Sequence, residues 1–232
     1  MWGVRMARAS FLRPYLGLLA LFLIVSCASD PSDHATTLKN VGPGVVIALG
    51  HEVSDFDTWK TGFDSRDALR AEFGLEIQSV LVGEDDLQVV WVIASAPSQE
   101  AAEAYLNDIG TARTMEADGV IGEVYRAVLD LGYTSSIDPD LYPDRLIVQH
   151  AVKDFEKWKS VFDGHIASRE RAGVVDLFVS HPVGDSTDVH MMFGIVNPQE
   201  TMDYMTSDAL RIAMKLSGVV GEPRAYFVRA SK

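Results

Sequence analysis

The stretch His51-Glu-Val-Ser-Asp-Phe-Asp-Thr-Trp-Lys-Thr-Gly-Phe-Asp64 decides the fold, because the chain contains it twice. It returns 99 residues later as His150-Ala-Val-Lys-Asp-Phe-Glu-Lys-Trp-Lys-Ser-Val-Phe-Asp163, with eight of the fourteen positions identical. The same offset pairs Gly119-Val-Ile-Gly-Glu123 with Gly218-Val-Val-Gly-Glu222. A period this long, present in two copies, predicts a duplicated domain and not a solenoid.

The period divides the 232-residue chain into two halves, each long enough to bury a core of its own. We place the first repeat at residues 45–131 and the second at residues 145–232. Residues 132–144 contain Pro139 and Pro143, a composition typical of a linker without structure of its own. The two repeats together predict a monomer that carries an internal pseudo-dimer.

The N-terminus has the pattern of an export signal. A segment with three arginines and no acidic residue precedes an apolar run from Tyr15 to Val25, which is too short to span a membrane comfortably. The run ends at Ile24-Val25-Ser26-Cys27, which resembles the lipobox of bacterial lipoproteins, and Cys27 is the single cysteine of the chain. The alternative is an ordinary signal peptide with an incidental cysteine.

The lipobox resemblance implies a cleaved signal peptide over residues 1–26 and an acylated Cys27 that anchors the mature chain in the lipid bilayer. Ala28, and not aspartate, follows the cysteine, which favours the periplasmic side of the outer membrane if the source is Gram-negative. Residues 27–44 show no apolar periodicity, so we expect a flexible tether there.

The charge of the chain limits its partners. The 33 acidic and 20 basic side chains give a formal net charge of −13. Such a surface repels the phosphates of nucleic acids and the headgroups of anionic lipids. Nucleic acid is therefore excluded as a partner, and membrane attachment depends on the acyl chains.

Each half shows the same order of predicted elements. A buried strand comes first, followed by a helix with Asp55 or Asp154 as its N-cap and Gly74 or Gly173 at its end. Two strands, a second helix and a last strand complete each half. This βαββαβ order defines the ferredoxin-like arrangement, whose antiparallel sheet has helices on one face only. The bare faces of two such sheets are expected to cover each other.

The motif His-x-Val-x-Asp-Phe-x-x-Trp-Lys-x-x-Phe-Asp, with Gly-Val-Val-Gly-Glu-Pro before the last strand, resembles the dimeric α+β barrel superfamily. Within it the chain is most similar to small proteins related to antibiotic-biosynthesis monooxygenases, sometimes labelled cyclases. The resemblance covers residues 45–130 and 145–230. It implies an α+β fold in which two tandem ferredoxin-like repeats form an intramolecular barrel. The superfamily holds oxygenases, isomerases, haem-degrading enzymes and proteins without known activity, so it constrains the chemistry poorly.

His51 and His150 are the candidate catalytic residues. Each ends the first strand of its half, where an imidazole can act as a general base or donate a hydrogen bond to a ligand. A histidine that only fastens the strand–helix turn explains the pattern equally well. His150 is the stronger candidate because Gln149 precedes it.

Trp59, Trp158, Arg70 and Arg169 complete the candidate ligand-binding set. The tryptophans recur between phenylalanines at core spacing, which favours packing of the helix against the sheet. The arginines share that helix face and can clamp a ligand carboxylate, although pairing with nearby acids is the simpler explanation.

Metal and cofactor chemistry lack a motif. With the first and third strands taken as parallel neighbours, His150 and His190 fall at opposite ends of the sheet, on the order of 20 Å apart. His165 and His181 have no neighbour at a ligand spacing. Haem-degrading relatives use an asparagine beside a tryptophan and a histidine, and neither first strand offers an asparagine. We therefore expect no metal and no cofactor.

Three functional hypotheses remain open. In the first, the chain binds a small apolar or aromatic molecule between the sheet and the first helix of one half, without assigned catalysis. In the second, it is a cofactor-independent monooxygenase-like or isomerase-like enzyme that uses His51 or His150. In the third, it is a non-catalytic module of the cell envelope whose own side chains fill the space. A cavity of at least about 300 Å³ beside either histidine separates the first two from the third.

Overall fold

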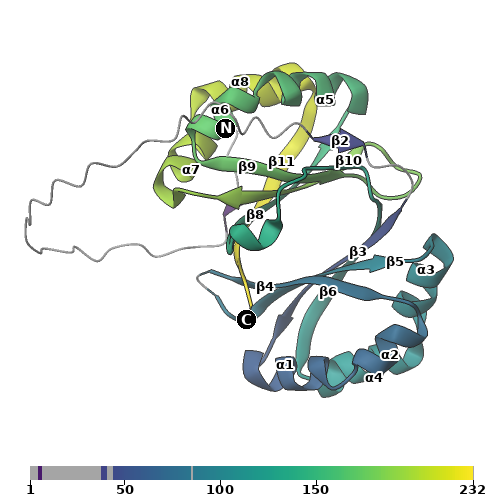
Figure 1. The fold of residues 1–232 in the computed structure, drawn as a ribbon. Coiled ribbons are helices and arrows are strands. Elements are labelled where there is room, and N and C mark those ends of the chain that lie inside the picture. Colours follow the sequence, from purple (N-terminus) through teal and green to yellow (C-terminus); the bar gives the residue numbers. More distant parts are fainter. Residues whose placement is uncertain (1–4, 7–37, 41–43, 85, 232) are drawn as a thin grey trace, which may run out of the picture.

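The computed structural model describes the chain except for residues 1–4, 7–37, 41–43, 85 and 232 (Figure 1). The cysteine of the predicted lipobox, and with it the lipid anchor, lies outside the described residues. Within the part of the chain that the structure describes, no helix is long and apolar enough to cross a membrane.

The first half contains four long strands and four short helices. In chain order they are β3 (Val45–Val53), α1 (Phe56–Asp64), α2 (Asp67–Glu72), β4 (Glu76–Gly83), β5 (Val89–Ala96), α3 (Gln99–Asn107), α4 (Ile109–Ala117) and β6 (Val120–Asp130). Each helical segment expected as one helix is therefore split into two.

The second half has the same order of elements. They are β8 (Asp144–Val152), α5 (Phe155–Gly164), α6 (Ile166–Arg171), β9 (Val174–Ser180), β10 (Asp188–Ile195), α7 (Pro198–Met205), α8 (Asp208–Ser217) and β11 (Val219–Ala230). The order agrees with the 99-residue period, while the origin of the halves by duplication stays a prediction.

Local sequence signals set the helix ends as expected. Asp55 accepts a hydrogen bond from the backbone N–H of Thr58 at 2.8 Å, and Asp154 accepts one from Lys157 at 2.7 Å. Both aspartates satisfy a free donor in the first turn of a helix, so the two predicted N-caps are confirmed. Gly74 and Gly173 follow the helices with φ of +69° and +68°, a conformation that glycine adopts without steric cost.

The strands of each half pair antiparallel, in the orders β4-β5-β3-β6 and β9-β10-β8-β11. The first and third strands of a half are thus antiparallel neighbours, and the prediction of parallel strands was wrong. In the second half His150 lies opposite Val189, and His190 lies opposite Gln149. The two histidines therefore occupy adjacent rungs of one ladder and are not on the order of 20 Å apart.

Two seams join the halves into a barrel. On one side β11 pairs with β4, from Val228 opposite Gly83 to Ala230 opposite Leu81. On the other side the end of β6 meets the segment after β9, where the N–H of Asp130 donates to the carbonyl of His181 at 3.0 Å. The two sheets face each other, and their helices lie on the outer faces (Figure 1).

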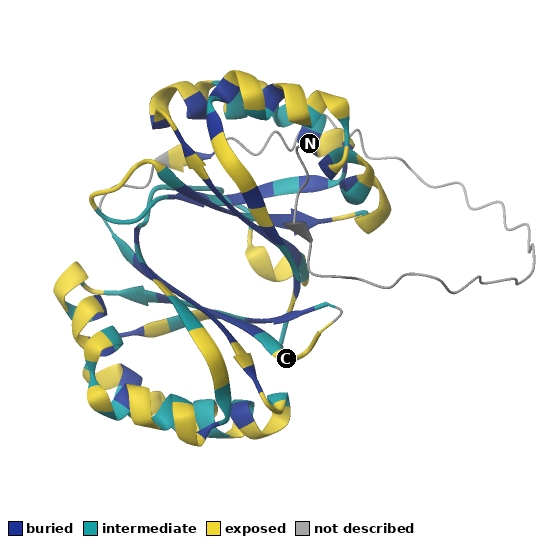
Figure 2. Ribbon diagram, turned by 180° about the vertical axis from the view of Figure 1, so that it is seen from behind, coloured by how far each residue is buried: buried dark blue, intermediate teal, exposed yellow. Residues whose placement is uncertain are grey.

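The buried residues fall into separate layers. Each half has a core between its sheet and its own helices, and smaller clusters lie between the two sheets. One of these inner clusters joins Leu81 and Trp91 of the first half to Ile147 and Val228 of the second. Figure 2 shows the strands largely buried and the outward faces of the helices exposed. The bare sheet faces therefore cover each other.

Two segments expected to lack structure carry short elements. In the predicted linker, β7 (Tyr133–Thr134) pairs with β9, and a 3₁₀ turn spans η2 (Pro139–Leu141). In the predicted tether, β2 (Lys39–Asn40) pairs with β7, and Leu38 joins the second-half core. Both expectations of unstructured chain are corrected at these positions, because the edge of β9 offers free backbone groups to pair with.

The predicted signal peptide also contributes one described element. Strand β1 (Arg5–Met6) runs parallel to β11, with Arg5 opposite Arg224 and Met6 opposite Ala225. A mature chain that begins at Cys27 would lack this pairing.

Candidate functional site

In the first half, the candidate residues meet between the sheet and α1. The ring of His51 lies 5.5 Å from that of Trp59, and Trp59 stacks on Phe63 at 4.9 Å between centroids. The guanidinium of Arg70 lies 3.9 Å from the centroid of Phe63. Imidazole, indole, phenyl ring and guanidinium form one stack, in which all but the partly buried Phe63 are buried and the tryptophan takes a core position.

The second half builds the same stack under α5. His150 lies 5.6 Å from Trp158, Trp158 stacks on Phe162 at 4.9 Å, and Arg169 lies 3.7 Å from the centroid of Phe162. The structure therefore brings the six predicted site residues together as two groups of three, one in each half.

The two histidines are buried without partners. His51 is 5% exposed and His150 is 8% exposed, and neither ring nitrogen of either residue has a hydrogen-bond partner among the described residues. Burial lowers the pKa of His51 to about 4, helped by the positive charge of Arg126. Burial lowers the pKa of His150 to about 4 as well, although Asp188 opposes the shift. Both imidazoles are therefore neutral at pH 7.

The two arginines are engaged by acids of the chain itself. Arg169 forms two hydrogen bonds of 2.6 Å with the carboxylate of Asp176, which is buried. Arg70 contacts Asp67 at 2.5 Å, and the side chain of Asp67 is 82% exposed. Each guanidinium also donates to a backbone carbonyl of the helix before it. Arg169 is therefore not free to clamp a ligand carboxylate, whereas Nε of Arg70 is buried without a partner among the described residues.

A small pocket lies beside each histidine, between the sheet and the helices. The pocket beside His150 measures about 90 Å³ and the pocket beside His51 about 30 Å³. Leu146, Met191 and Phe193 are among the mostly apolar residues that line the larger one. We call it the second-half pocket. Both volumes fall short of the roughly 300 Å³ at which ligand pockets usually begin.

The difference in volume has a local cause. In the first half Arg66 and Asp118 form a largely buried ion pair that borders the pocket. The residues at the same positions of the second half, 99 residues later, are His165 and Ser217, which do not pair. Gly62 makes room for the first-half pair, since a Cβ there would lie 2.2 Å from a carboxylate oxygen of Asp118.

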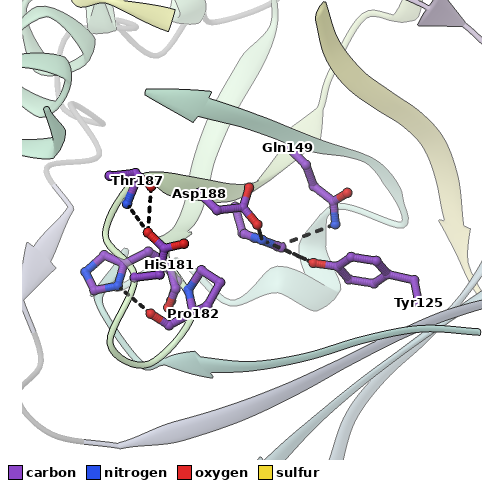
Figure 3. Close-up of polar contacts among 9 residues, drawn as sticks. Tyr125, Gln149, His181, Pro182, Thr187 and Asp188 are labelled. Atoms are coloured by element: carbon purple, nitrogen blue, oxygen red, sulfur yellow. Dashed lines mark hydrogen bonds and ion pairs between the residues drawn. The ribbon is translucent and has the colours of Figure 1, made fainter. Parts of the chain in front are cut away.

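A second polar cluster lies between the two sheets (Figure 3). The Tyr125 hydroxyl, from the first half, lies 3.2 Å from Nε2 of His190, and the carboxylate of Asp188 lies 3.0 Å from the same nitrogen. The amide of Gln149 lies 3.4 Å from Nδ1 of His190. Successive residues of a strand point to opposite faces, so Gln149 faces this cluster and not the pocket of His150. Gln149 therefore does not support His150, and the prediction that it does was wrong.

A cleft of about 970 Å³ is lined by residues of β3, β5, β6 and β11, together with the β4–β5 turn and the start of α7. Trp91 and Tyr125 of the first half and Tyr226 of the second are among its lining residues. We call it the inter-half cleft. His51 also borders this cleft, but its imidazole packs on the other face of β3 against Trp59.

The cluster could not be predicted while the first and third strands were taken as parallel. An antiparallel register places His190 opposite Gln149, and this pairing was available as a signal once the ferredoxin-like order had been recognised. The contact with Tyr125 depends on how the two halves pack, and no local pattern encodes it. Among the described residues, no group of three or more histidine, cysteine, aspartate or glutamate side chains is placed to hold a metal ion.

No family model matches the sequence, and no curated protein matches it. Solved structures do share its fold. A candidate monooxygenase from Fusobacterium nucleatum aligns over 83% of this chain and 94% of its own, with a TM-score of 0.53 and 9% identity. An anthrone oxidase-like protein aligns over 84% and 95%, with a TM-score of 0.53 and 10% identity.

A candidate chlorite dismutase aligns over 82% of this chain and 96% of its own, with a TM-score of 0.51 and 11% identity. Identities this low establish the fold alone. The chain thus shares the α+β fold of these solved structures, in agreement with the fold class that the sequence motif implied.

Proposed function

We propose that the chain is a small-molecule enzyme of the cofactor-independent monooxygenase-like or isomerase-like kind, with its reaction site in the second-half pocket. The observation that carries the proposal is His150, a neutral imidazole without a hydrogen-bond partner in an apolar pocket. A buried polar group that is left unpaired costs stability, and such groups concentrate where a ligand or a reaction uses them. The names of the structural neighbours agree with an oxygenase-like reaction.

The chemistry that His150 supports is proton abstraction. A neutral imidazole can accept a proton from a weakly acidic O–H or C–H group of a bound substrate. The low pKa of His150 makes it a weak base by itself. The anion that the substrate becomes then lies beside the imidazolium, and this opposite charge raises the pKa at the moment of transfer. In an oxygenase-type reaction the anion reacts with molecular oxygen as co-substrate.

The second half is the better site because no ion pair fills its pocket, where Arg169 is the one charged residue among mostly apolar described lining residues. Arg66 and Asp118 seal the corresponding space in the first half. A substrate that enters there has to displace an ion pair, whereas a substrate beside His150 displaces mostly apolar contacts. His51 therefore serves as a matched control for His150, with the same residue type, the same aromatic neighbour and a closed pocket.

Haem does not fit this site. The second-half pocket holds about 90 Å³, far below the space that a porphyrin needs, and Arg169 already has its own partner. We assign no haem chemistry to this pocket.

The small volume also supports the rival hypothesis of a non-catalytic envelope module. If the pocket never opens, the chain's own side chains fill it, and His150 is only a core residue. The ligand test below separates the two. Binding without catalysis, the simplest form of the proposal, requires only that the pocket widen around a small apolar molecule.

The location of the protein is part of the proposal. We propose that Cys27 is acylated and anchors the folded part to the envelope membrane, on the basis of the lipobox-like sequence alone. Replacing Cys27 with serine is expected to move the protein from the detergent phase to the aqueous phase in detergent partitioning. A variant that still partitions like the parent protein contradicts the anchor.

Native mass spectrometry of the protein purified from its own host tests the ligand site. We expect a retained molecule of low polarity. A triple variant, Val161→Gly with His165→Arg and Ser217→Asp, copies the first-half ion pair into the second half and is expected to abolish retention while the circular dichroism spectrum stays unchanged. If the triple variant still retains the molecule, the ligand binds outside the second-half pocket.

Oxygen uptake with the retained molecule as substrate tests catalysis. His150→Gln should lower the rate by about 100-fold or more, the usual contribution of a general base. His51→Gln is the control and should leave the rate near that of the parent protein. Equal losses in both variants, or none in either, contradict the assignment of His150.

A further inference from the structure

The inter-half cleft is separate from the second-half pocket and has a different chemical character. Its volume of about 970 Å³ is ample for a ligand, and residues of both halves line it. Its features do not depend on the function proposed for His150, because the side chain of His150 packs on the opposite face of the sheet.

An aromatic wall forms one side of the cleft. The indole of Trp91 lies 5.5 Å from the ring of Tyr125 and 5.1 Å from the ring of Tyr226, with both pairs tilted. Gly50 makes this possible, because a Cβ at that position would lie 2.9 Å from the indole ring of Trp91. Three aromatic residues from two halves thus meet at one place.

A hydrogen-bonded cluster outside the cleft orients the ring of Tyr125 in the aromatic wall. The hydroxyl of Tyr125 lies within hydrogen-bond distance of His190, which is bound in turn by Asp188 (Figure 3). Burial raises the pKa of Tyr125 to about 12, so the phenol stays protonated and uncharged. Because the hydroxyl of Tyr125 contacts His190, the part of Tyr125 that lines the cleft is its aromatic ring and not its hydroxyl.

Acidic side chains outnumber basic ones around the wall, although the guanidinium of Arg224 lies 5.9 Å from the centroid of Tyr125. Four carboxylates line the cleft, namely Glu52, Glu84, Asp86 and Glu123, and its described lining contains no lysine or arginine. Glu84 lies 3.9 Å from Arg229, while the other three acids are exposed. An apolar cleft with low-dielectric walls focuses this negative potential on whatever enters it.

One further group in the wall lacks a partner. Trp91 is 3% exposed, and its indole N–H has no acceptor among the described residues. An unpaired buried donor marks a place where an oxygen atom from outside the chain can complete the site.

We propose that the inter-half cleft binds an organic cation, an alkylated ammonium group that also carries a hydroxyl or ether oxygen. Aromatic faces attract such cations through the ring quadrupole, and carboxylates at the rim raise their local concentration. The indole N–H of Trp91 supplies a donor for the ligand oxygen. The chain itself contains a cation–aromatic contact at this wall, because the guanidinium of Arg224 lies 5.9 Å from the centroid of Tyr125.

Calorimetric titration with two isosteric probes tests the charge requirement. Choline carries a trimethylammonium group, and 3,3-dimethylbutanol has the same shape with a carbon in place of the nitrogen. We expect choline to bind at least about fivefold more tightly, the ratio that a partly desolvated cation–aromatic contact gives. Equal affinities of the two probes, or no measurable binding of choline, overturn the proposal.

Variants then locate the site. Tyr226→Leu removes an aromatic face and Glu123→Gln removes a charge at the rim of the cleft. Each of these variants is expected to bind choline severalfold more weakly. Tyr125→Phe keeps the aromatic ring and should change the affinity for choline little. Glu170→Gln, at an exposed acid of α6, is the matched control. Arg224→Gln removes a competing cation and should strengthen binding. If Tyr226→Leu disturbs folding, the Glu123 and Arg224 variants decide. If the affinity for choline is the same in both of these variants as in the parent protein, the cation binds elsewhere and the assignment is overturned.

Discussion

In the first half an ion pair between Arg66 and Asp118 fills the space beside His51, whereas the second half has His165 and Ser217 at those positions and keeps a pocket beside His150. The stack of histidine, tryptophan and phenylalanine is the same in both halves. Shared residues therefore maintain the packing of helix on sheet. The residues that differ determine whether a small molecule has room to bind.

The arginines of the two stacks, Arg70 and Arg169, also differ between the halves in their acidic partners. Arg169 has a buried partner, Asp176, while the corresponding first-half position is Ile77 and Arg70 relies on the exposed Asp67. Both partners of the Arg66–Asp118 pair line the first-half pocket, whereas in the second half Arg169 lines the pocket and its partner Asp176 does not. The described lining of the second-half pocket therefore contains no carboxylate and is mostly apolar.

The largest expected effect comes from separating the two halves. Each sheet buries its inner face only against the other, through clusters such as Leu81 and Trp91 with Ile147 and Val228. A chain cut between residues 135 and 143 should therefore give halves that self-associate when expressed alone, since each exposes a large apolar face. Size-exclusion chromatography should show a heterodimer on co-expression. Two separately monomeric, folded halves contradict a shared barrel.

The next largest effect tests the two arginines against each other. Asp176→Ala leaves the guanidinium of Arg169 buried without its carboxylate and should cost about 3–5 kcal/mol of unfolding free energy. Asp67→Ala removes an exposed partner of Arg70 and should cost less than about 1 kcal/mol. Chemical denaturation of both variants measures the difference. Similar losses would show that exposure does not decide the strength of these pairs.

Most of the fold was predictable because its signals are local. The caps at Asp55 and Asp154 and the glycines at Gly74 and Gly173 mark helix ends through their own backbone geometry. Because the sequence repeats after 99 residues, each of these helix ends could be predicted independently in both halves. The direction of neighbouring strands carries no such local signal, and there the prediction failed, with His150 and His190 as the consequence.

The candidate sites were predictable in part. The repeated motif identified His51 and His150 with their tryptophans, but their lack of partners and the size of the pockets depend on residues from several elements. Arg66 and Asp118 are 52 residues apart, and only packing brings them together. The wall of Trp91, Tyr125 and Tyr226 crosses between the halves, so no pattern within one repeat reveals it.

The buried histidines make stability depend on pH. Their folded-state pKa values are lowered from 6.5 to about 4, so the folded protein binds fewer protons than the unfolded chain between these values. Stability should therefore be complete above about pH 6.5 and fall as the pH drops toward 4, by at most about 3 kcal/mol for each histidine. Denaturation of a His51→Leu/His150→Leu variant should show a flatter profile in this window. An unchanged profile means that the histidines are not its cause.

The smallest effect is the most informative about function. Leucine in place of His150 removes two unpaired ring nitrogens from an apolar site, so at pH 7 we expect the variant to be as stable as the parent protein or up to about 1–3 kcal/mol more stable. His51→Leu should behave in the same way if both histidines lack partners. A loss of stability in both variants would mean that a buried water or an undetected partner satisfies the rings, and that they fasten the strand–helix turn. A gain at His150, combined with loss of ligand retention, would show that the chain keeps this histidine at a cost in stability because the second-half pocket uses it.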